Sequence, residues 1–291
     1  MPIRRIEFEV AGDTVVGDLH LPNGEWPFPA VVTGGPMTSV KEQVTGTYAA
    51  ALADRGFAAL AIDHRYYGES GGQPRQYEFY PHKIEDLKAT IDALAAQPDV
   101  DETRLGAVGI CLGSGYLAHA IKARSDIRAF VAIAGYYRDV PAMMAEDPQG
   151  FQDRVEQGRE AREVHEATGE VAMIPAVSLE QDAAMTLQST YDYYAERAAH
   201  PNYKNAFSVM SREHFLQFDV QSAAPDLRLP FLQLHGPNAL NPAWADKFFR
   251  AVPGEKQQVS LLSKGQTDIY DDPGIVADAS DQAADFLRNV L

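Results

Sequence analysis

A cysteine flanked by glycines is the feature of this sequence best suited to chemistry. Gly109-Ile110-Cys111-Leu112-Gly113 follows an apolar run typical of a strand and precedes an alanine-rich run typical of a helix. A strand, a sharp turn and a helix in this order form a nucleophile elbow, in which the strained turn exposes the nucleophile. The two glycines allow the strand and the helix to cross closely. We therefore predict that Cys111 is a catalytic nucleophile; the alternative is a buried structural cysteine.

The helix after this turn would act on the cysteine electrostatically. A helix N-terminus carries partial positive charge, which favours a thiolate over a thiol. The backbone N–H of Leu112 would also point toward the oxyanion that forms when a carbonyl is attacked. We therefore expect a lowered pKa for Cys111 and place Leu112 in an oxyanion hole.

The elements that must position this turn alternate between strands and helices. Residues 3–10 and 14–21 alternate apolar and polar side chains, which predicts an antiparallel pair with a turn at Gly12-Asp13. Buried strands are then expected, with helices between them, at residues 30–32, 57–62, 105–110, 129–134, 230–235 and 258–262. This order predicts a mostly parallel sheet with helices on both faces.

One internal segment differs from the rest in composition. Residues 139–206 contain 13 Asp and Glu against 5 Lys and Arg, so about half of the net charge of −16 lies there. The segment is helical in character and rich in Met and Tyr. Inserted helices over the carboxyl ends of strands are where a lid would lie. We predict a core of residues 1–138 and 207–291 and a helical lid of residues 139–206; the alternative is that its Met and Tyr only attach it to the sheet.

Composition limits the partners of the chain. Its 291 residues suit one α/β domain with an insertion, and no apolar run approaches the roughly 18 residues that span a bilayer. The acidic balance argues against nucleic acids and anionic membranes. The N-terminus has no apolar signal region and one cysteine allows no internal disulfide, which fits a cytoplasmic location. We expect a small-molecule substrate, and a homodimer is compatible with the sequence.

Several motifs, in order along the chain, resemble a bacterial group of α/β-hydrolases related to dienelactone hydrolase and to hydrolases labelled as polyketide transferases. They are GPMTSVKEQ, AIDHRYYGESGGQPRQYE, KIEDLKATIDAL, VDETRLGAVGICLGSGY and DIYDDP. The resemblance implies an α/β-hydrolase fold: a mostly parallel, doubly wound sheet, here with the helical lid inserted after the sixth strand. It implies a Ser or Cys nucleophile, then an acid and a histidine, with ester, lactone or thioester substrates and no metal or organic cofactor. Its oxyanion hole would fall on Leu112 and Met37, because Pro36 has no N–H to donate.

The sequence departs from this group where protons are transferred, which predicts a degenerate catalytic triad. The group reads roughly G-x-x-H-x-D-x-Y-D before the last helix, and aligning Asp268 and Tyr270 places Gln266 at the histidine position. An amide accepts no proton at neutral pH, although it can hydrogen-bond a substrate carbonyl or the thiol. His235-Gly236 is also not followed by the usual carboxylate.

Three other residues are candidates for the missing base or acid. His64 lies on the loop after the fourth strand, His82 is expected to cap the following helix, and Asp139 comes just after the sixth strand. A structural or surface role is the alternative for each histidine. Asp139 has no histidine to orient.

Two classes of function follow. The first is a hydrolase or acyl transferase of secondary metabolism, with a Cys nucleophile and a small, largely apolar, polyketide-like substrate. The second is a non-hydrolytic cyclase, lyase or isomerase that uses the oxyanion hole of the degenerate triad. A catalytically dead binding protein is a further alternative.

Overall fold

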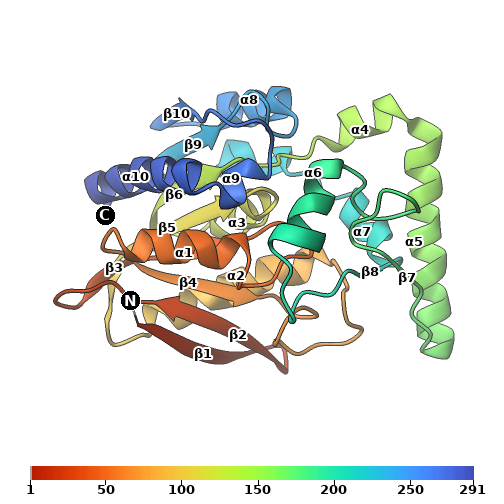
Figure 1. Ribbon diagram of the computed structural model, residues 1–291, viewed down its shortest axis with the longest axis horizontal. Helices are drawn as coiled ribbons and strands as arrows, with labels where there is room; N and C mark the ends of the chain where they lie inside the picture. Colours follow the sequence, from red (N-terminus) through yellow and green to blue (C-terminus); the bar gives the residue numbers. More distant parts are fainter. Residues whose placement is uncertain (1) are drawn as a thin grey trace.

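The computed structural model describes residues 2–291 and is built around an eight-stranded sheet in the order β1-β2-β4-β3-β5-β6-β9-β10 (Figure 1). The strands are β1 (Ile3–Val10), β2 (Asp13–His20), β3 (Phe28–Gly34), β4 (Ala58–Asp63), β5 (Val100–Ile110), β6 (Ile127–Ile133), β9 (Phe231–His235) and β10 (Lys256–Ser260). Strand β2 is antiparallel to both of its neighbours, and the other pairs are parallel. The predicted hairpin and the mostly parallel sheet are confirmed.

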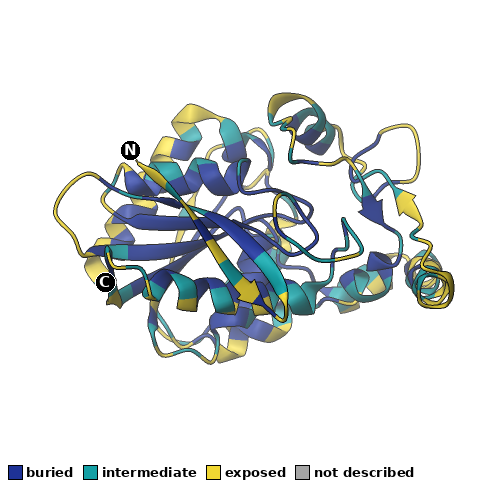
Figure 2. Cartoon of the chain, turned by 90° about the horizontal axis from the view of Figure 1, so that it is seen from below, coloured by how far each residue is buried: buried dark blue, intermediate teal, exposed yellow. Residues whose placement is uncertain are grey.

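Helices cover both faces of the sheet, as the alternating pattern predicts. Helices α1 (Val44–Ala53) and α10 (Pro273–Val290) pack together on one face, and α2 (Tyr80–Ala95) and α3 (Gly113–Ile121) pack together on the other. Strands covered in this way are largely apolar and buried, and Figure 2 shows the central strands mostly in the buried colour. In β4 the apolar run of residues 58–62 precedes Asp63, and all six residues are buried. Among residues 2–291, no helix has the length and apolar character needed to cross a bilayer.

The chain between β6 and β9 gathers at one end of the sheet, where α5 forms an outer edge (Figure 1). Its elements are α4 (Val140–Glu146), α5 (Pro148–Thr168), β7 (Met173–Ile174), α6 (Gln188–Tyr191), a π-helical turn (Asp192–Arg197), β8 (Phe207–Ser208), α7 (Ser211–Leu216) and a 3₁₀-helix (Gln221–Asp226). Arg162 of α5 pairs with Glu213 of α7 at 2.6 Å, and β7 pairs with β8. The packed unit therefore continues beyond Ala206 through α7.

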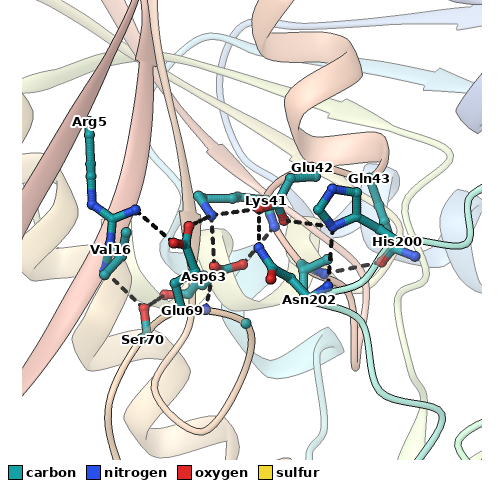
Figure 3. A network of polar contacts seen from close by, with 12 residues as sticks. Arg5, Val16, Lys41, Glu42, Gln43, Asp63, Glu69, Ser70, His200 and Asn202 are labelled. Carbon is teal, nitrogen blue, oxygen red and sulfur yellow. Dashed lines mark hydrogen bonds and ion pairs between the residues drawn. The ribbon is translucent and has the colours of Figure 1, made fainter.

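A polar network holds the loop between β3 and α1 (Figure 3). The backbone N–H of Lys41 donates to Asp63 Oδ1 at 2.8 Å, and Lys41 Nζ donates to Asp63 Oδ2 at 3.1 Å and to Glu42 Oε1 at 2.7 Å. Glu69 accepts a further bond from Lys41 Nζ. Asn202 Nδ2 donates to Glu42 Oε1 at 2.7 Å from the inserted segment. The loop is thus fixed from the sheet on one side and from the insertion on the other.

Candidate active site

Cys111 occupies the turn between β5 and α3 with a φ of +54°. This left-handed conformation is uncommon for a residue with a Cβ and is typical of strained functional turns. A Cβ on Gly109 would lie 2.5 Å from Ser114 Cα, and one on Gly113 would lie 2.1 Å from the Gly34 carbonyl oxygen. The strand–turn–helix geometry predicted from the two glycines is therefore present.

Cys111 lines a cavity of about 330 Å³ between the carboxyl ends of the parallel strands and the inserted segment. The lining side chains are mostly apolar: Pro36, Met37, Cys111, Leu112, Tyr136, Arg138, Met143, Ala184, Met185, Thr186, Leu187, Thr190, Tyr194, Phe215, Leu216, Leu240, Asn241 and Tyr270. Among the Met and Tyr residues of the insertion, Met143, Met185 and Tyr194 face the cavity. Met144 and Met173 do not line it and are 45% and 44% exposed.

Leu112 and Met37, the two residues expected to form the oxyanion hole, both line the cavity. The Leu112 N–H adjoins Cys111 and opposes the rise in the pKa of its thiol. Met37 also lines the cavity, and its N–H donates to no backbone or side-chain oxygen of residues 2–291. The next residue, Thr38, is fixed because its N–H donates to Glu78 Oε2 at 3.0 Å. The geometry leaves the Met37 N–H free to bind a substrate oxygen.

Gln266 precedes the short helix α9 (Asp268–Asp271), and its amide is fully engaged. Nε2 donates to the Ala134 carbonyl oxygen at 2.8 Å and to the Tyr270 hydroxyl oxygen at 3.1 Å. Oε1 accepts the Leu240 N–H at 3.0 Å. The amide also lies near enough to Cys111 to oppose the rise in the pKa of the thiol.

Tyr270 is a site residue that sequence reasoning did not identify. Its hydroxyl lies near enough to the Cys111 sulfur to oppose the rise in the pKa of the thiol, and burial raises the pKa of Tyr270 well above the ordinary value, so the hydroxyl keeps its proton. In the sequence, Tyr270 served only to align the motif that places Gln266 at the histidine position. Its place in the same DIYDDP motif, four residues after Gln266, was the available signal, and the two side chains are hydrogen-bonded at 3.1 Å.

The expectation of a lowered pKa for Cys111 is wrong. Burial raises the pKa of the thiol above its ordinary value, although hydrogen bonds from Tyr270 and from the Leu112 N–H oppose this effect. The side chain is only 6% exposed, so loss of solvation outweighs the favourable position at the helix N-terminus.

His64 and His82 lie outside the cavity, as structural roles would place them. His64 is buried, and its Nδ1 hydrogen-bonds Asp86 Oδ2 at 3.1 Å in a cluster with Arg65; burial lowers the pKa of His64. His82 hydrogen-bonds the hydroxyl of Tyr66. His82 does not cap α2, contrary to expectation, because the helix begins at Tyr80 and His82 lies within its first turn.

Asp139 has a structural contact at each carboxylate oxygen. Its Oδ1 accepts the Ala142 N–H at 3.3 Å and so caps α4, and its Oδ2 pairs with Lys247. Asp139 is not among the lining residues of the cavity. Capping explains its place after β6 without a catalytic role.

One group of carboxylates has the spacing of metal ligands. Ligand atoms of Glu42, Asp63 and Glu69 lie within 4.8 Å of one another. Lys41 Nζ contacts all three, so its ammonium group supplies the positive charge that they require (Figure 3).

Residues 41–273 match the protein family described as "Serine aminopeptidase, S33". The chain belongs to this α/β-hydrolase family. It is 32% identical over 275 residues to the protein YcjY of Escherichia coli (strain K12), which covers 91% of this chain and 89% of that protein. It is 28% identical over 159 residues to the esterase FrsA of Vibrio cholerae, which covers 52% of this chain and 36% of that protein.

Solved structures show the same fold. The crystal structure of PA2218 from Pseudomonas aeruginosa has a TM-score of 0.85 and 28% identity, with 100% of this chain and 94% of that chain covered. A dienelactone hydrolase from Anabaena variabilis has a TM-score of 0.60 and 15% identity over 100% of this chain and 98% of that chain, which concerns the fold alone. The predicted α/β-hydrolase fold is confirmed, and the family and its relatives support a hydrolase that acts on ester bonds.

Proposed function

We propose that the protein transfers the acyl group of a small, largely apolar ester, lactone or thioester. In the intermediate, the acyl group is bound to the sulfur of Cys111 as a thioester. The strained conformation of Cys111 at the wall of an apolar cavity carries this proposal. Leu112, Met37 and Tyr270 line the same cavity as Cys111. The Leu112 N–H and the Tyr270 hydroxyl also oppose the rise in the pKa of the Cys111 thiol. The resemblance of the motifs supports a polyketide-like acyl group and a role in secondary metabolism, and the single cysteine supports a cytoplasmic location.

The proposed reaction begins when the Cys111 thiol loses its proton to solvent. The thiolate attacks the carbonyl carbon, a C–S bond forms, and the C=O electron pair moves to oxygen, where the Leu112 and Met37 N–H groups stabilise it. The pair then returns as the bond to the alcohol or thiol leaving group breaks. The leaving group takes the bonding electrons and receives a proton from solvent. Because the thiolate is the nucleophile and burial raises the thiol pKa, acylation should become faster as pH rises.

We also propose that residues 139–206 act as a lid on this cavity. Met143, Met185 and Tyr194 supply part of the apolar wall opposite the elbow. Such a wall excludes water from the acyl group and selects it by shape.

A specific observation favours the non-hydrolytic alternative for the second half of the reaction. Water needs a base to attack an acyl-enzyme, and the amide of Gln266 is committed to Ala134, Tyr270 and Leu240. No histidine is among the residues that line the cavity in the described chain. The acyl group would then pass to an acceptor other than water, or the oxyanion hole would serve a cyclase, lyase or isomerase.

Acetylation of Cys111 by p-nitrophenyl acetate tests the proposal. At alkaline pH we expect a burst of about one p-nitrophenol per chain, a single added acetyl group on Cys111 by peptide mass spectrometry, and slow turnover afterwards. Cys111→Ala should give neither the burst nor the adduct. A burst that persists in Cys111→Ala would exclude Cys111 as the nucleophile, and an unreactive Cys111 in the folded protein would favour a binding protein.

A further inference from the structure

A buried arginine faces the Cys111 cavity without a carboxylate partner. Arg138 follows β6, lines the cavity and is only 2% exposed. Its Nη2 donates to the Leu216 carbonyl oxygen at 3.0 Å, and its guanidinium carbon lies 4.2 Å from the centroid of the Phe215 ring. Its Nε is buried without a hydrogen-bond partner, and no Asp or Glu of residues 2–291 forms an ion pair with it.

Other buried arginines in the chain are neutralised by carboxylates. Arg65 Nε contacts Asp86 at 2.6 Å, and Arg212 Nη2 contacts Asp182 at 2.6 Å. Burial of a cation without an anionic partner costs free energy, and an anionic ligand would offset this cost. Arg138 differs from these two residues in lining the cavity that contains Cys111.

The single positive charge in the wall of the cavity favours a ligand with an anionic group. Arg138 is the one charged side chain among the lining residues of the described chain, although the protein carries a net charge of −16. The hydroxyl of Tyr194 is also buried without a hydrogen-bond partner and belongs to the same wall. The remaining lining side chains are mostly apolar. Two unpaired donors in such a cavity match a ligand that is apolar along its length and carries an anionic group.

We propose that Arg138 binds a carboxylate on the acyl part of the substrate. The substrate class then narrows to half-esters, or half-thioesters, of dicarboxylic acids. A guanidinium group presents parallel N–H donors that fit the two oxygens of a carboxylate, and the Tyr194 hydroxyl supplies a further donor. This proposal deepens the proposed acyl transfer and uses the same cavity, but carboxylate binding itself requires no catalysis.

Alkylation of Cys111 by iodoacetate and by iodoacetamide tests the site without acyl chemistry. Both reagents form an S–C bond at Cys111 with loss of iodide, and they differ in carrying a carboxylate or an amide. We expect the iodoacetate-to-iodoacetamide rate ratio at Cys111 to exceed that of free 2-mercaptoethanol by at least fivefold, against the repulsion expected from the net charge. Glutarate should also protect Cys111 from iodoacetamide better than glutaramide does.

Substitutions of Arg138 and Arg212 test which arginine causes the preference for iodoacetate. Arg138→Gln should return the rate ratio to that of the free thiol, Arg138→Lys should retain part of it, and Arg212→Gln, at a buried arginine outside the cavity, should leave it unchanged. A ratio equal to that of the free thiol in the unaltered protein, with equal protection by glutarate and glutaramide, would overturn the carboxylate site. A preference that persists in folded Arg138→Gln would also overturn the assignment to Arg138. The rate ratio and the protection by glutarate are both measured on the unaltered protein, so these two tests do not depend on the folding of a variant.

A pair of esters separates this proposal from the proposed function. Mono-p-nitrophenyl glutarate should acylate Cys111 at least tenfold faster than p-nitrophenyl butyrate in the unaltered protein, and Arg138→Gln should abolish this difference. Equal rates for both esters would refute the carboxylate site and leave acyl transfer intact. Absence of acylation by either ester, together with selective iodoacetate labelling, would refute acyl transfer and leave the site intact.

Discussion

The reactivity of Cys111 depends on burial and on the hydrogen bond from Tyr270. Burial raises the thiol pKa, and the Tyr270 hydroxyl stabilises the thiolate and so opposes the rise. We expect the midpoint of iodoacetamide labelling against pH to lie above the ordinary thiol value of about 8.5. Tyr270→Phe should move the midpoint higher, because it removes the donor. A midpoint below the ordinary value in the unaltered protein would show that the helix N-terminus dominates after all.

Gln266 lies where a histidine would serve as the base, so Gln266→His should restore proton transfer. General-base assistance is worth a factor of about 10² to 10⁴. Turnover of p-nitrophenyl acetate should therefore rise at least tenfold, short of the full factor because the orienting acid is missing. Gln257→His, on the exposed side of β10, is the matched control. An unchanged rate in Gln266→His would show that no proton is transferred from this position.

Arg138 is the candidate site residue that the sequence could not reveal, because its burial depends on tertiary packing. Cys111 and Gln266 stand in local patterns, a glycine-flanked turn and a spaced motif, which can be recognised in the chain itself. Arg138 is indistinguishable by type from a surface arginine, and its burial arises because α7 places Phe215 and Leu216 over it. The direction of the thiol pKa shift was also mispredicted, because the burial of Cys111 arises from tertiary packing.

At the scale of elements, ion pairs between side chains hold the loop after β3, so the stability of the protein should depend on pH. Hydrogen bonds from Lys41 and Arg5 lower the pKa of Glu69 to about 2. A carboxylate with a lowered folded-state pKa stabilises the protein above its unfolded pKa, and this contribution is lost as pH falls from about 4.5 toward 2. Glu69→Gln should therefore lower the free energy of unfolding at neutral pH by about 1 kcal/mol or less, because the pair is partly exposed.

Urea unfolding at about pH 7 and about pH 3 measures this effect. The difference between the unaltered protein and Glu69→Gln should shrink at the lower pH. Glu180→Gln, at an exposed residue outside the ion pairs of the described chain, should change little at either pH. A difference for Glu69→Gln that grows on acidification would contradict the assigned sign.

Strands and helices were largely predictable, and their ends were not. Buried parallel strands such as β4 are continuous apolar runs, which stand out in the sequence. Strand β5 begins at Val100 rather than at 105, because Val100 pairs with Phe28 of β3 before the polar residues 101–104, where the register between the two strands shifts. Burial rather than pairing produces the apolar pattern, so a strand can continue where the pattern stops.

At the scale of the whole molecule, the cavity exists only because distant segments meet. The elbow, the loop after β3 and the loop before α9 lie at the carboxyl ends of parallel strands, so the fold class alone brings them together. The path of the insertion is different, because helices of mixed polarity can cover several faces of a sheet. Helix α4 turns one methionine toward the cavity and leaves its neighbour exposed, a choice that composition does not encode.

This pair of methionines allows a test of whether the insertion limits the substrate. Met143 lines the cavity, whereas Met144, next to it in α4, does not and is 45% exposed. Met143→Ala should enlarge the cavity and favour longer acyl chains, since each additional buried methylene contributes about 0.8 kcal/mol, or about fourfold in rate. The ratio of Cys111 acylation rates for p-nitrophenyl octanoate and acetate should therefore rise at least fourfold. Met144→Ala should leave the ratio unchanged; an equal shift in both variants, or in neither, would show that α4 does not bound the acyl group.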